Sequence, residues 1–257
     1  AVVESDQVNF AGVAPILIYL ADRREIVTIS GLGTWPLAAS LDLFKKEYAG
    51  SIPEGLLRTV VPAAPAAWIM ALEKFGTMSF GEVSSAALRL ARDGYPIHHF
   101  TAAEIGKRED HYRRWPHNAE IYLPNGEIPQ PGELFIQSDL GRTLQYLVDE
   151  EESASSKGRK AGLKAARDAF YLGDIATTIV DYHHQNGGLL SAHDMASFQV
   201  EIEPPVSTKF RGVDVYTCGF WSQGPILLQT LNLLEGYDLA GLGHNSASYI
   251  HILVEAL

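Results

Sequence analysis

One stretch of the sequence carries a serine where a hydrolase could place a nucleophile. Residues 217–225 read TCGFWSQGP, between an apolar run typical of a strand and one typical of a helix. A nucleophile elbow of the G-x-S-x-G type lies at such a junction, because glycines two residues before and after the serine let the backbone turn sharply. Here Gly224 is present, but Phe220 fills the upstream position. On these residues Ser222 is a candidate for attack or for capping the turn, and both interpretations stay open.

Histidine pairs and one serine–histidine–aspartate run suggest two other chemistries. Neighbouring residues on a helix point about 100° apart, so the pairs at 98–99 and 183–184 do not make a chelating set, and no cysteine or second histidine one turn away completes one. We therefore expect no metal site. Residues 191–194 read SAHD, but a catalytic triad is made by residues brought together in space. Ser191 is better explained as the N-cap of a short helix.

The elements that would position these residues begin with strands. Residues 13–20 and 25–30 are rich in β-formers and joined by a polar turn, which predicts a hairpin, and alternation over 213–217 predicts a later strand. Between them the apolar spacing becomes helical. Helices are expected over 37–48, 65–75, 80–92, 101–114, 138–148, 159–170, 174–185, 225–234 and 246–257.

Stop and start signals divide these helices. Ser79 with Glu82 forms a capping box sequence, Ser138 is the expected cap of the helix that follows it, and prolines and glycines over 118–135 predict a turn-rich excursion. The order is β, then many helices, then β, then helices, and no repeat or linker interrupts it. This order is typical of an α+β protein in which distant strands share a sheet. We therefore expect residues 1–257 to form a single domain.

Composition and charge narrow the classes of function. The chain has 257 residues, 46% hydrophobic and 20% charged, which suits a globular protein with a substantial core. Its formal net charge of -11 argues against a nucleic-acid-binding surface, which needs clustered lysine and arginine. A single cysteine, Cys218, excludes an internal disulfide, and its place at the end of a strand-like run predicts a buried, inert thiol.

Targeting features and the two ends of the chain lead to further expectations. The longest apolar stretches, such as 12–20, are too short to span a bilayer, and no signal-peptide pattern is visible, which slightly favours the cytoplasm and predicts no membrane partner. The sequence starts without methionine inside core-like material and ends within an amphipathic helix. We expect it to be part of a larger polypeptide.

Three stretches together resemble the large subunit of the gamma-glutamyltranspeptidase family, within the N-terminal-nucleophile hydrolase superfamily. The first, residues 61–97, reads VPAAPAAWIMALEKFGTMSFGEVSSAALRLARDGYPI. The second, residues 170–217, contains FYLGDIATTIVDYHHQNGGLLSAHDMASF and FRGVDVYT. The third, residues 222–257, reads SQGPILLQTLNLLEGYDLAGLGHNSASYIHILVEAL. They follow one another in order over most of the chain, and no single one would carry the resemblance.

The resemblance implies a self-cleaving precursor. In this family the freed α-amino group of a threonine activates the hydroxyl of the same residue for attack on an amide carbonyl, since a hydroxyl is a weak nucleophile until a base can take its proton. That threonine begins the small subunit, downstream of residue 257. The family fold is an αββα sandwich, to which this chain would give part of the sheets and most of the helical cover. The small subunit is thus the implied partner, no catalytic residue is expected in this chain, and Ser222 becomes a cap or a polar group of the pocket.

One departure from the family changes the expected substrate. The transpeptidases carry an arginine after the second strand of the hairpin, and it grips the α-carboxylate of the γ-glutamyl group. The equivalent segment here, residues 30–36, reads SGLGTWP, with Leu32 where that arginine would fall. An isobutyl group cannot replace a bidentate guanidinium. Residues 8–15, VNFAGVAP, likewise replace a glycine-rich run. We therefore expect hydrolysis of a small amide whose acyl part is not a standard γ-glutamyl group.

The expected pocket residues are Gly31, Leu32, Gly33, Trp35, Ser222 and Gln223. Gly31 and Gly33 are explained most simply as turn glycines with positive φ, and Trp35 as either pocket wall or core. No cofactor is expected, because the acyl transfer uses the amine and hydroxyl of the protein itself. Two alternatives remain: a true γ-glutamyltransferase or glutathione hydrolase with another carboxylate anchor, and a catalytically dead member that acts as a binding protein. Whether the heterodimers assemble further into a homo-oligomer is open.

Overall fold

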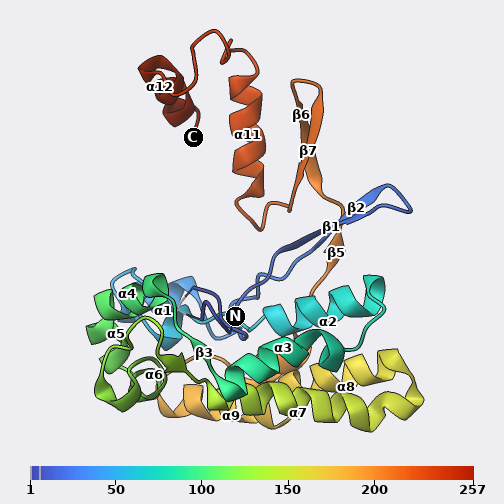
Figure 1. The fold of residues 1–257 in the computed structure, drawn as a ribbon, viewed down its shortest axis with the longest axis vertical. Helices are drawn as coiled ribbons and strands as arrows, with labels where there is room; N and C mark the ends of the chain where they lie inside the picture. Colours follow the sequence, from blue (N-terminus) through green and yellow to red (C-terminus); the bar gives the residue numbers. More distant parts are fainter. Residues whose placement is uncertain (1, 6) are drawn as a thin grey trace. The chain divides into compact units, whose positions relative to one another are not determined.

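The chain divides into two compact units in a computed structural model that describes residues 2–5 and 7–257 (Figure 1). Unit 1 comprises the N-terminal segment up to Gly12 together with Thr34–Phe198, and unit 2 comprises Val13–Gly33 together with Gln199–Leu257. Each unit is thus assembled from pieces of chain that are far apart in sequence. The expectation that 1–257 forms one domain, completed by a downstream part, stays a prediction.

Unit 1 is mainly helical. Its helices are α1 (Leu41–Glu47), α2 (Ala64–Phe75), α3 (Phe80–Asp93), α4 (His99–Lys107), α5 (Glu109–Arg113), α6 (Pro116–Tyr122), α7 (Ser138–Ala154), α8 (Arg159–Tyr171), α9 (Asp174–Gln185) and α10 (Ala192–Ser197). Short 3₁₀ turns lie at η1 (Leu56–Arg58), η2 (Pro124–Gly126) and η3 (Ser155–Lys157), and β3 (Tyr95–Pro96) pairs antiparallel with β4 (Leu134–Phe135). Helix α7 packs against both α3 and α8, and it forms the centre of the unit.

Several of the expected helix boundaries are wrong: α1 begins at Leu41 rather than at 37, and α7 continues to Ala154 rather than ending at 148. The helix expected over 101–114 is broken at Arg108, which leaves helical geometry (φ -114°, ψ 20°) between α4 and α5. Pro116, expected to end that helix before a run of turns, instead starts α6, because a first-turn proline has no N–H to leave unpaired. Helix α7 has Gln137 rather than Ser138 at its N-cap position.

Helix α3 has two sources of capping at its N-terminus. The expected capping box is present: Glu82 N donates to Ser79 Oγ (3.0 Å), and Ser79 N donates to the Glu82 carboxylate (2.7 Å). In addition, the buried Glu151 of α7 accepts hydrogen bonds from Phe80 N and Gly81 N, both at 2.8 Å. A carboxylate at a helix N-terminus satisfies free N–H groups and is stabilised by the helix dipole. Glu151 therefore joins α7 to the start of α3.

Helix α2 starts without a side-chain cap, and distant groups satisfy its first N–H groups. Gly12 O accepts hydrogen bonds from Ala63 N and Ala64 N, both at 2.9 Å. The buried Tyr171 hydroxyl of α8 accepts from Ala66 N (3.2 Å) and donates to Pro62 O (2.6 Å). Burial raises the pKa of Tyr171 far above its usual range, so the hydroxyl keeps its proton and its role as a donor.

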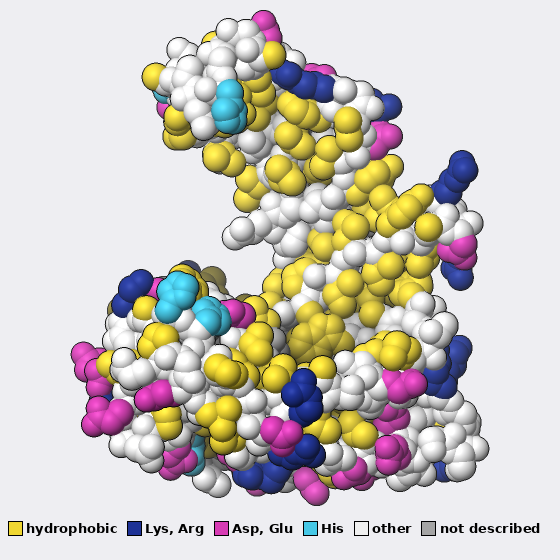
Figure 2. All heavy atoms as spheres, in the orientation of Figure 1, with side chains coloured by type: hydrophobic (Ala, Val, Ile, Leu, Met, Phe, Trp, Pro, Cys, Tyr) yellow, Lys and Arg dark blue, Asp and Glu magenta, His cyan; other side chains and the backbone are white. Residues whose placement is uncertain are grey.

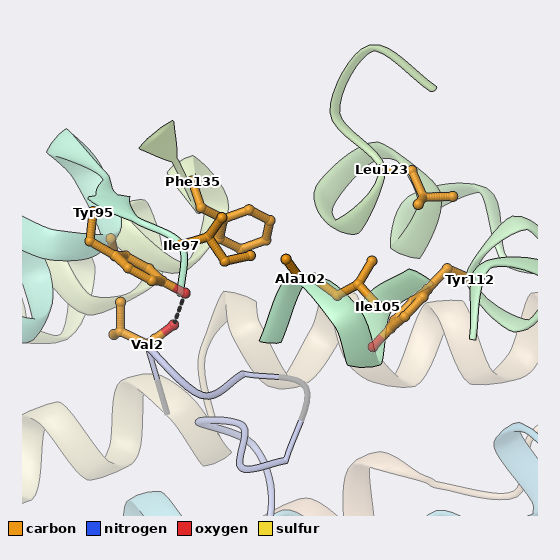
Figure 3. Close-up of a cluster of buried hydrophobic side chains, with 9 residues drawn as sticks. Val2, Tyr95, Ile97, Ala102, Ile105, Tyr112, Leu123 and Phe135 are labelled. Atoms are coloured by element: carbon orange, nitrogen blue, oxygen red, sulfur yellow. Dashed lines mark hydrogen bonds between the residues drawn. The ribbon is translucent and has the colours of Figure 1, made fainter. Parts of the chain in front are cut away.

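A core cluster lies where the N-terminal segment meets α4 and the β3–β4 pair (Figure 3). Its buried members are Val2, Ala91, Tyr95, Ile97, Ala102, Ile105, Tyr112, Leu123 and Phe135. The rings of Tyr95 and Phe135 meet edge to face with centroids 6.0 Å apart, a favoured aromatic geometry. Apolar residues from the N-terminal segment and from the middle of the chain thus share one core.

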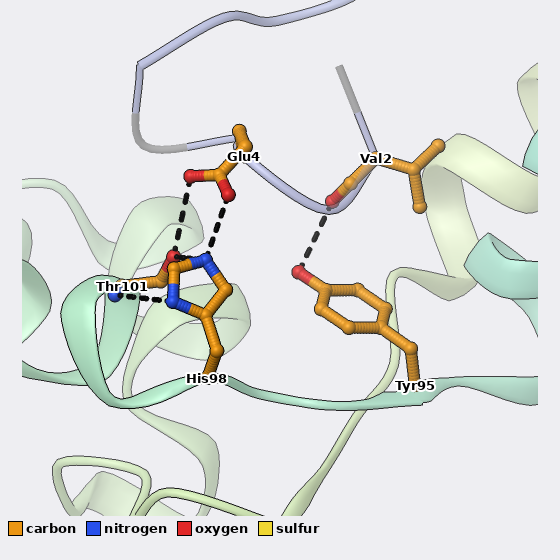
Figure 4. Close-up of polar contacts among 5 residues, drawn as sticks. All are labelled: Val2, Glu4, Tyr95, His98 and Thr101. Atoms are coloured by element: carbon orange, nitrogen blue, oxygen red, sulfur yellow. Dashed lines mark hydrogen bonds and ion pairs between the residues drawn. The ribbon is translucent and has the colours of Figure 1, made fainter.

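Polar contacts also join the N-terminal segment to the rest of unit 1 (Figure 4). Val2 O accepts from the Tyr95 hydroxyl (3.1 Å) and from Gln137 Nε2 (2.7 Å). Glu4 Oε1 lies 2.7 Å from His98 Nε2, and His98 Nδ1 accepts from Thr101 N (3.5 Å) at the start of α4. His98 is therefore a helix cap with a carboxylate partner.

Unit 2 contains the predicted hairpin. Strand β1 (Ile16–Leu20) pairs antiparallel with β2 (Glu25–Ile29), which also pairs with β5 (Ile202–Glu203), in the order β1–β2–β5. A second hairpin joins β6 (Val206–Phe210) and β7 (Val213–Thr217), and it is followed by α11 (Gly224–Leu234) and α12 (Ala247–Ala256). The mixture of helices and antiparallel strands confirms the α+β class. Among the described residues, no helix has the length and apolar character needed to cross a bilayer.

Candidate functional site

The first group of predicted site residues follows β2 in unit 2. Gly31 N donates to Ile29 O (2.9 Å), and Gly31 O accepts from Ala14 N (2.6 Å), so this turn lies beside the segment that leads into β1. Gly33 has positive φ (82°), as expected, whereas Gly31 does not, so that expectation is wrong for Gly31. The hydrogen bond from Ala14 N resembles one of a strand pair, and the backbone of Gly31 keeps a φ angle outside the positive region. Leu32, between them, keeps 38% of its surface exposed.

The second group lies between β7 and α11. Ser222 Oγ donates to Gly219 O (2.9 Å) and accepts from Gly224 N (3.1 Å), so the hydroxyl closes the turn that starts α11. Both of its hydrogen-bond partners are backbone groups, and neither can take a proton as a general base. Gln223 is exposed at the N-cap position of α11 without a side-chain hydrogen bond. This geometry supports the interpretation of Ser222 as a cap.

The residues two positions before and after Ser222 differ in how they fit the turn. Phe220 is 85% exposed, so its ring lies outside the turn rather than inside it. At Gly224, a Cβ would overlap Thr217 Oγ1 and lie 2.8 Å from Cys218 O. The start of α11 approaches the end of β7 so closely that only glycine fits there.

Both groups lie near the start of β1. Gly31 contacts Ala14, and Cys218 Sγ lies 3.9 Å from Ile16 O. Ile16 pairs with Ile29, so this is the open end of the β1–β2 hairpin. No hydrogen bond among the described residues joins the two groups directly. Cys218 is half-buried rather than buried as expected. Partial burial, together with the nearby Glu203 charge, raises the pKa of its thiol, which is expected to stay protonated and unreactive.

Trp35, the remaining predicted residue, belongs to unit 1. It is 45% exposed, and its ring meets Phe44 edge to face with centroids 6.0 Å apart. Its extended segment is fixed on one side by Thr34 O, which accepts from Val61 N (2.8 Å). The partial exposure argues against an ordinary core residue, and the role of Trp35 as a pocket wall stays a prediction.

Asp194 joins the start of α10 to the distant segment at Leu37, a contact that the sequence analysis did not predict. It is buried, and its carboxylate accepts from Leu37 N (2.9 Å), Ser191 N (2.9 Å) and Ser191 Oγ (2.5 Å). Burial raises the pKa of Asp194. The hydrogen bonds from Ser191 and Leu37 and the charge of His193 lower it by more, so the pKa lies below its usual value. The expected N-cap at Ser191 is confirmed, with Asp194 completing the capping box.

Glu203 is a second missed residue. Its carboxylate accepts a hydrogen bond from Trp221 Nε1 at 2.6 Å, which holds the indole beside the turn at Gly219. Two residues 18 apart in sequence give no local signal of such a contact. The pair adds a carboxylate and an indole to the surroundings of Ser222.

Comparison with known proteins places this arrangement in a family. The model of the family described as gamma-glutamyltranspeptidase matches residues 1–257. The chain is 30% identical to the glutathione hydrolase-like YwrD proenzyme of Bacillus subtilis, covering 100% of this chain and 46% of that protein. It is 31% identical to the acylase ACY 1 proenzyme of a Pseudomonas species, covering 93% of this chain and 42% of that protein. It therefore spans less than half the length of these relatives.

The solved structures agree. The crystal structure of Helicobacter pylori gamma-glutamyltranspeptidase superimposes with a TM-score of 0.87 at 27% identity, covering 99% of this chain and 70% of that one. The Bacillus anthracis transpeptidase CapD superimposes with a TM-score of 0.73 at 25% identity, covering 99% of this chain and 76% of that one. With the family model matched along all 257 residues, the chain belongs to the gamma-glutamyltranspeptidase family.

Proposed function

We propose that this chain is the large-subunit part of a self-processing amidohydrolase whose N-terminal threonine nucleophile lies in the downstream part of the same precursor. The observation that supports this most directly is the family match over the whole chain, to relatives named as proenzymes that are more than twice as long. The hydrogen bonds of Ser222 support it too, because they use the hydroxyl to close a turn. The chain supplies a wall of the pocket, and the downstream part supplies the attacking group.

Unit 2 has the surface that such a downstream part would cover. Among the described residues β1 pairs with β2 alone, so its outer edge offers free backbone groups for another strand. Large apolar side chains are exposed on the second hairpin and on both C-terminal helices, among them Val213 (63%), Leu233 (60%) and Val254 (62%). Figure 2 shows hydrophobic side chains gathered over β6–β7 and α11. We infer that the small subunit packs here and completes the sandwich.

Intact mass spectrometry with N-terminal sequencing of the full-length protein tests this proposal without a substrate. We expect incubation to convert the precursor into two fragments, the smaller beginning with threonine. A stable, folded and uncleaved chain would contradict self-processing. It would support the catalytically dead alternative and would make Ser222 a candidate nucleophile again, to be checked with Ser222→Ala.

The substrate proposal rests on Leu32. We propose that the processed enzyme hydrolyses a small amide with an acyl group that is not γ-glutamyl. One relative is named an acylase and another glutathione hydrolase-like at nearly the same identity, so the residue at position 32 carries the proposal. Leu32 is partly exposed in the turn after β2 and offers no charge to an α-carboxylate. A wild-type enzyme with high turnover of γ-glutamyl amides would favour the alternative of a different anchor.

Leu32→Arg is expected to raise kcat/KM for γ-glutamyl-p-nitroanilide about tenfold or more, because a charge-assisted bidentate pair is worth roughly 1.5–3 kcal/mol. The measurement is the release of p-nitroaniline by processed enzyme. Leu172→Arg is the matched control, because this leucine is 56% exposed and is not one of the predicted pocket residues. No gain in a variant that still cleaves itself would show that position 32 does not set acyl specificity.

A further inference from the structure

A cavity of about 560 Å³ lies in unit 1, lined in part by the N-terminal segment. The segment contributes Ser5, Asn9 and Phe10 to its lining, and α7 and α9 contribute the opposite wall. Apolar side chains such as Phe170 and Ile175 cover most of that surface. The volume is within the range typical of sites for small molecules.

The Ser5 hydroxyl lines this cavity without a hydrogen-bond partner. Ser5 is 9% exposed, and its Oγ is a buried polar atom that pairs with nothing in the described part of the chain, although its carbonyl accepts from the Tyr122 hydroxyl (3.1 Å). Leaving a buried hydroxyl unpaired costs about 1–3 kcal/mol. Two other hydroxyls of the lining are already used, because Thr143 Oγ1 donates to Asp139 O and Thr178 Oγ1 donates to Asp174 O. A bound molecule could provide the partner that Ser5 Oγ lacks.

The charge of the cavity lining is negative. Asp174 is the described lining residue that carries a charge. The pKa of Tyr146 is raised by burial and then by the charges of Glu150 and Asp174, which is consistent with negative potential along this wall. One N–H of the Gln137 amide donates to Val2 O, which leaves the carbonyl oxygen and the second N–H of that side chain for a ligand. The negative charge favours a cationic ligand over an anion.

We propose that this cavity is a binding site for a small primary amine with an apolar body, its ammonium group directed to Asp174 and a hydrogen bond completed at Ser5 Oγ. The apolar wall accepts the body of the molecule, and the acidic side chain selects its charge. The proposal does not depend on the amide chemistry proposed above, and it holds whether or not the precursor cleaves itself.

Saturation-transfer NMR titration of the full-length protein tests this, with 2-phenylethylamine as the probe and 3-phenylpropionate as its charge-reversed counterpart. We expect the amine to bind at least tenfold more tightly than the carboxylate. Ser5→Ala should weaken amine binding about fivefold to tenfold, and Asp174→Asn should remove the preference for the amine. The matched controls are Ser153→Ala on α7 and Asp181→Asn on α9, which lie outside the cavity lining and should change neither affinity.

Equal binding of the two probes, or equal weakening by the control variants, would overturn the proposal. So would a crystal soaked with the amine that shows only water at Ser5 Oγ. If Ser5→Ala does not fold, Asp174→Asn carries the test, and an unchanged preference for the amine in that variant would overturn the proposal.

Discussion

Glu151→Ala is expected to lower the free energy of unfolding by about 3 kcal/mol, since two charge-assisted hydrogen bonds to buried N–H groups are lost. Phe80 N and Gly81 N would have no acceptor at the start of α3. The alanine variant also loses a packing contact, because Gly162 packs so closely that a Cβ there would lie 3.0 Å from Glu151 Cγ. The measurement is urea denaturation followed by circular dichroism, with the midpoint shifted at constant slope.

Glu151→Gln separates charge from shape in the same experiment. One carboxylate oxygen becomes an NH₂ group that would face a backbone N–H, so we expect this variant to be nearly as unstable as the alanine variant. Glu152→Ala is the matched control, because Glu152 is the exposed neighbour and should change stability by less than about 0.5 kcal/mol. Full stability of Glu151→Gln would show that the helix start is satisfied in another way.

Gly224→Ala is expected to cost about 2–3 kcal/mol and to displace the turn that carries Ser222 and Gln223. The new methyl group would overlap Thr217 Oγ1 and would lie only 2.8 Å from the backbone oxygen of Cys218. Rotation of the threonine can relieve the first overlap, but the second requires β7 and α11 to move apart. The midpoint of thermal unfolding and the rate of amide hydrolysis should therefore fall together.

Gly236→Ala is the control for this substitution. Gly236 follows the same helix, and nothing in the described part of the chain lies within 4 Å of its Cβ position. Alanine restricts the unfolded chain more than glycine does, so the stability of this variant should be unchanged or slightly higher. Thr217→Ala combined with Gly224→Ala should recover part of the loss. A Gly224→Ala protein as stable as wild type would mean that this turn is not constrained by the close approach.

Local features of the fold could be predicted from the sequence. The capping boxes at Ser79 and Ser191 involve residues three apart, and the first hairpin has a short polar turn, so the interactions that define them are close in the chain. The family could be recognised from three ordered stretches. The substitution of Leu32 for an arginine could be noticed in the same way, because it lies in a short motif.

The long-range contacts could not be predicted. Asp194 reaches Leu37 N across 157 residues, and Glu151 reaches Phe80 N across 71. Glu151 does not differ in local sequence from the exposed Glu152 beside it, and the local sequence of Asp194 indicates its contact with Ser191 but not the one with Leu37. The break at Arg108 was missed because helical spacing continues through it. The helix that starts at Pro116 was missed because a proline can end a helix or begin one, and the prolines and glycines of 118–135 favoured turns. The relation between Trp35 and the unit 2 turns remains a prediction.

The N-terminal segment also bears on the order in which the protein folds. Val2 O is held by side chains 93 and 135 residues further along, and strand β2 receives its second neighbour, β5, from across 175 residues. Contacts of such separation close large loops and form late. During synthesis, residues up to Ile29 therefore emerge before their partners at the start of α7 and in β5 have been made. Their apolar side chains stay exposed in this interval. Newly made chains should be most sensitive to aggregation and to chaperone supply in this interval.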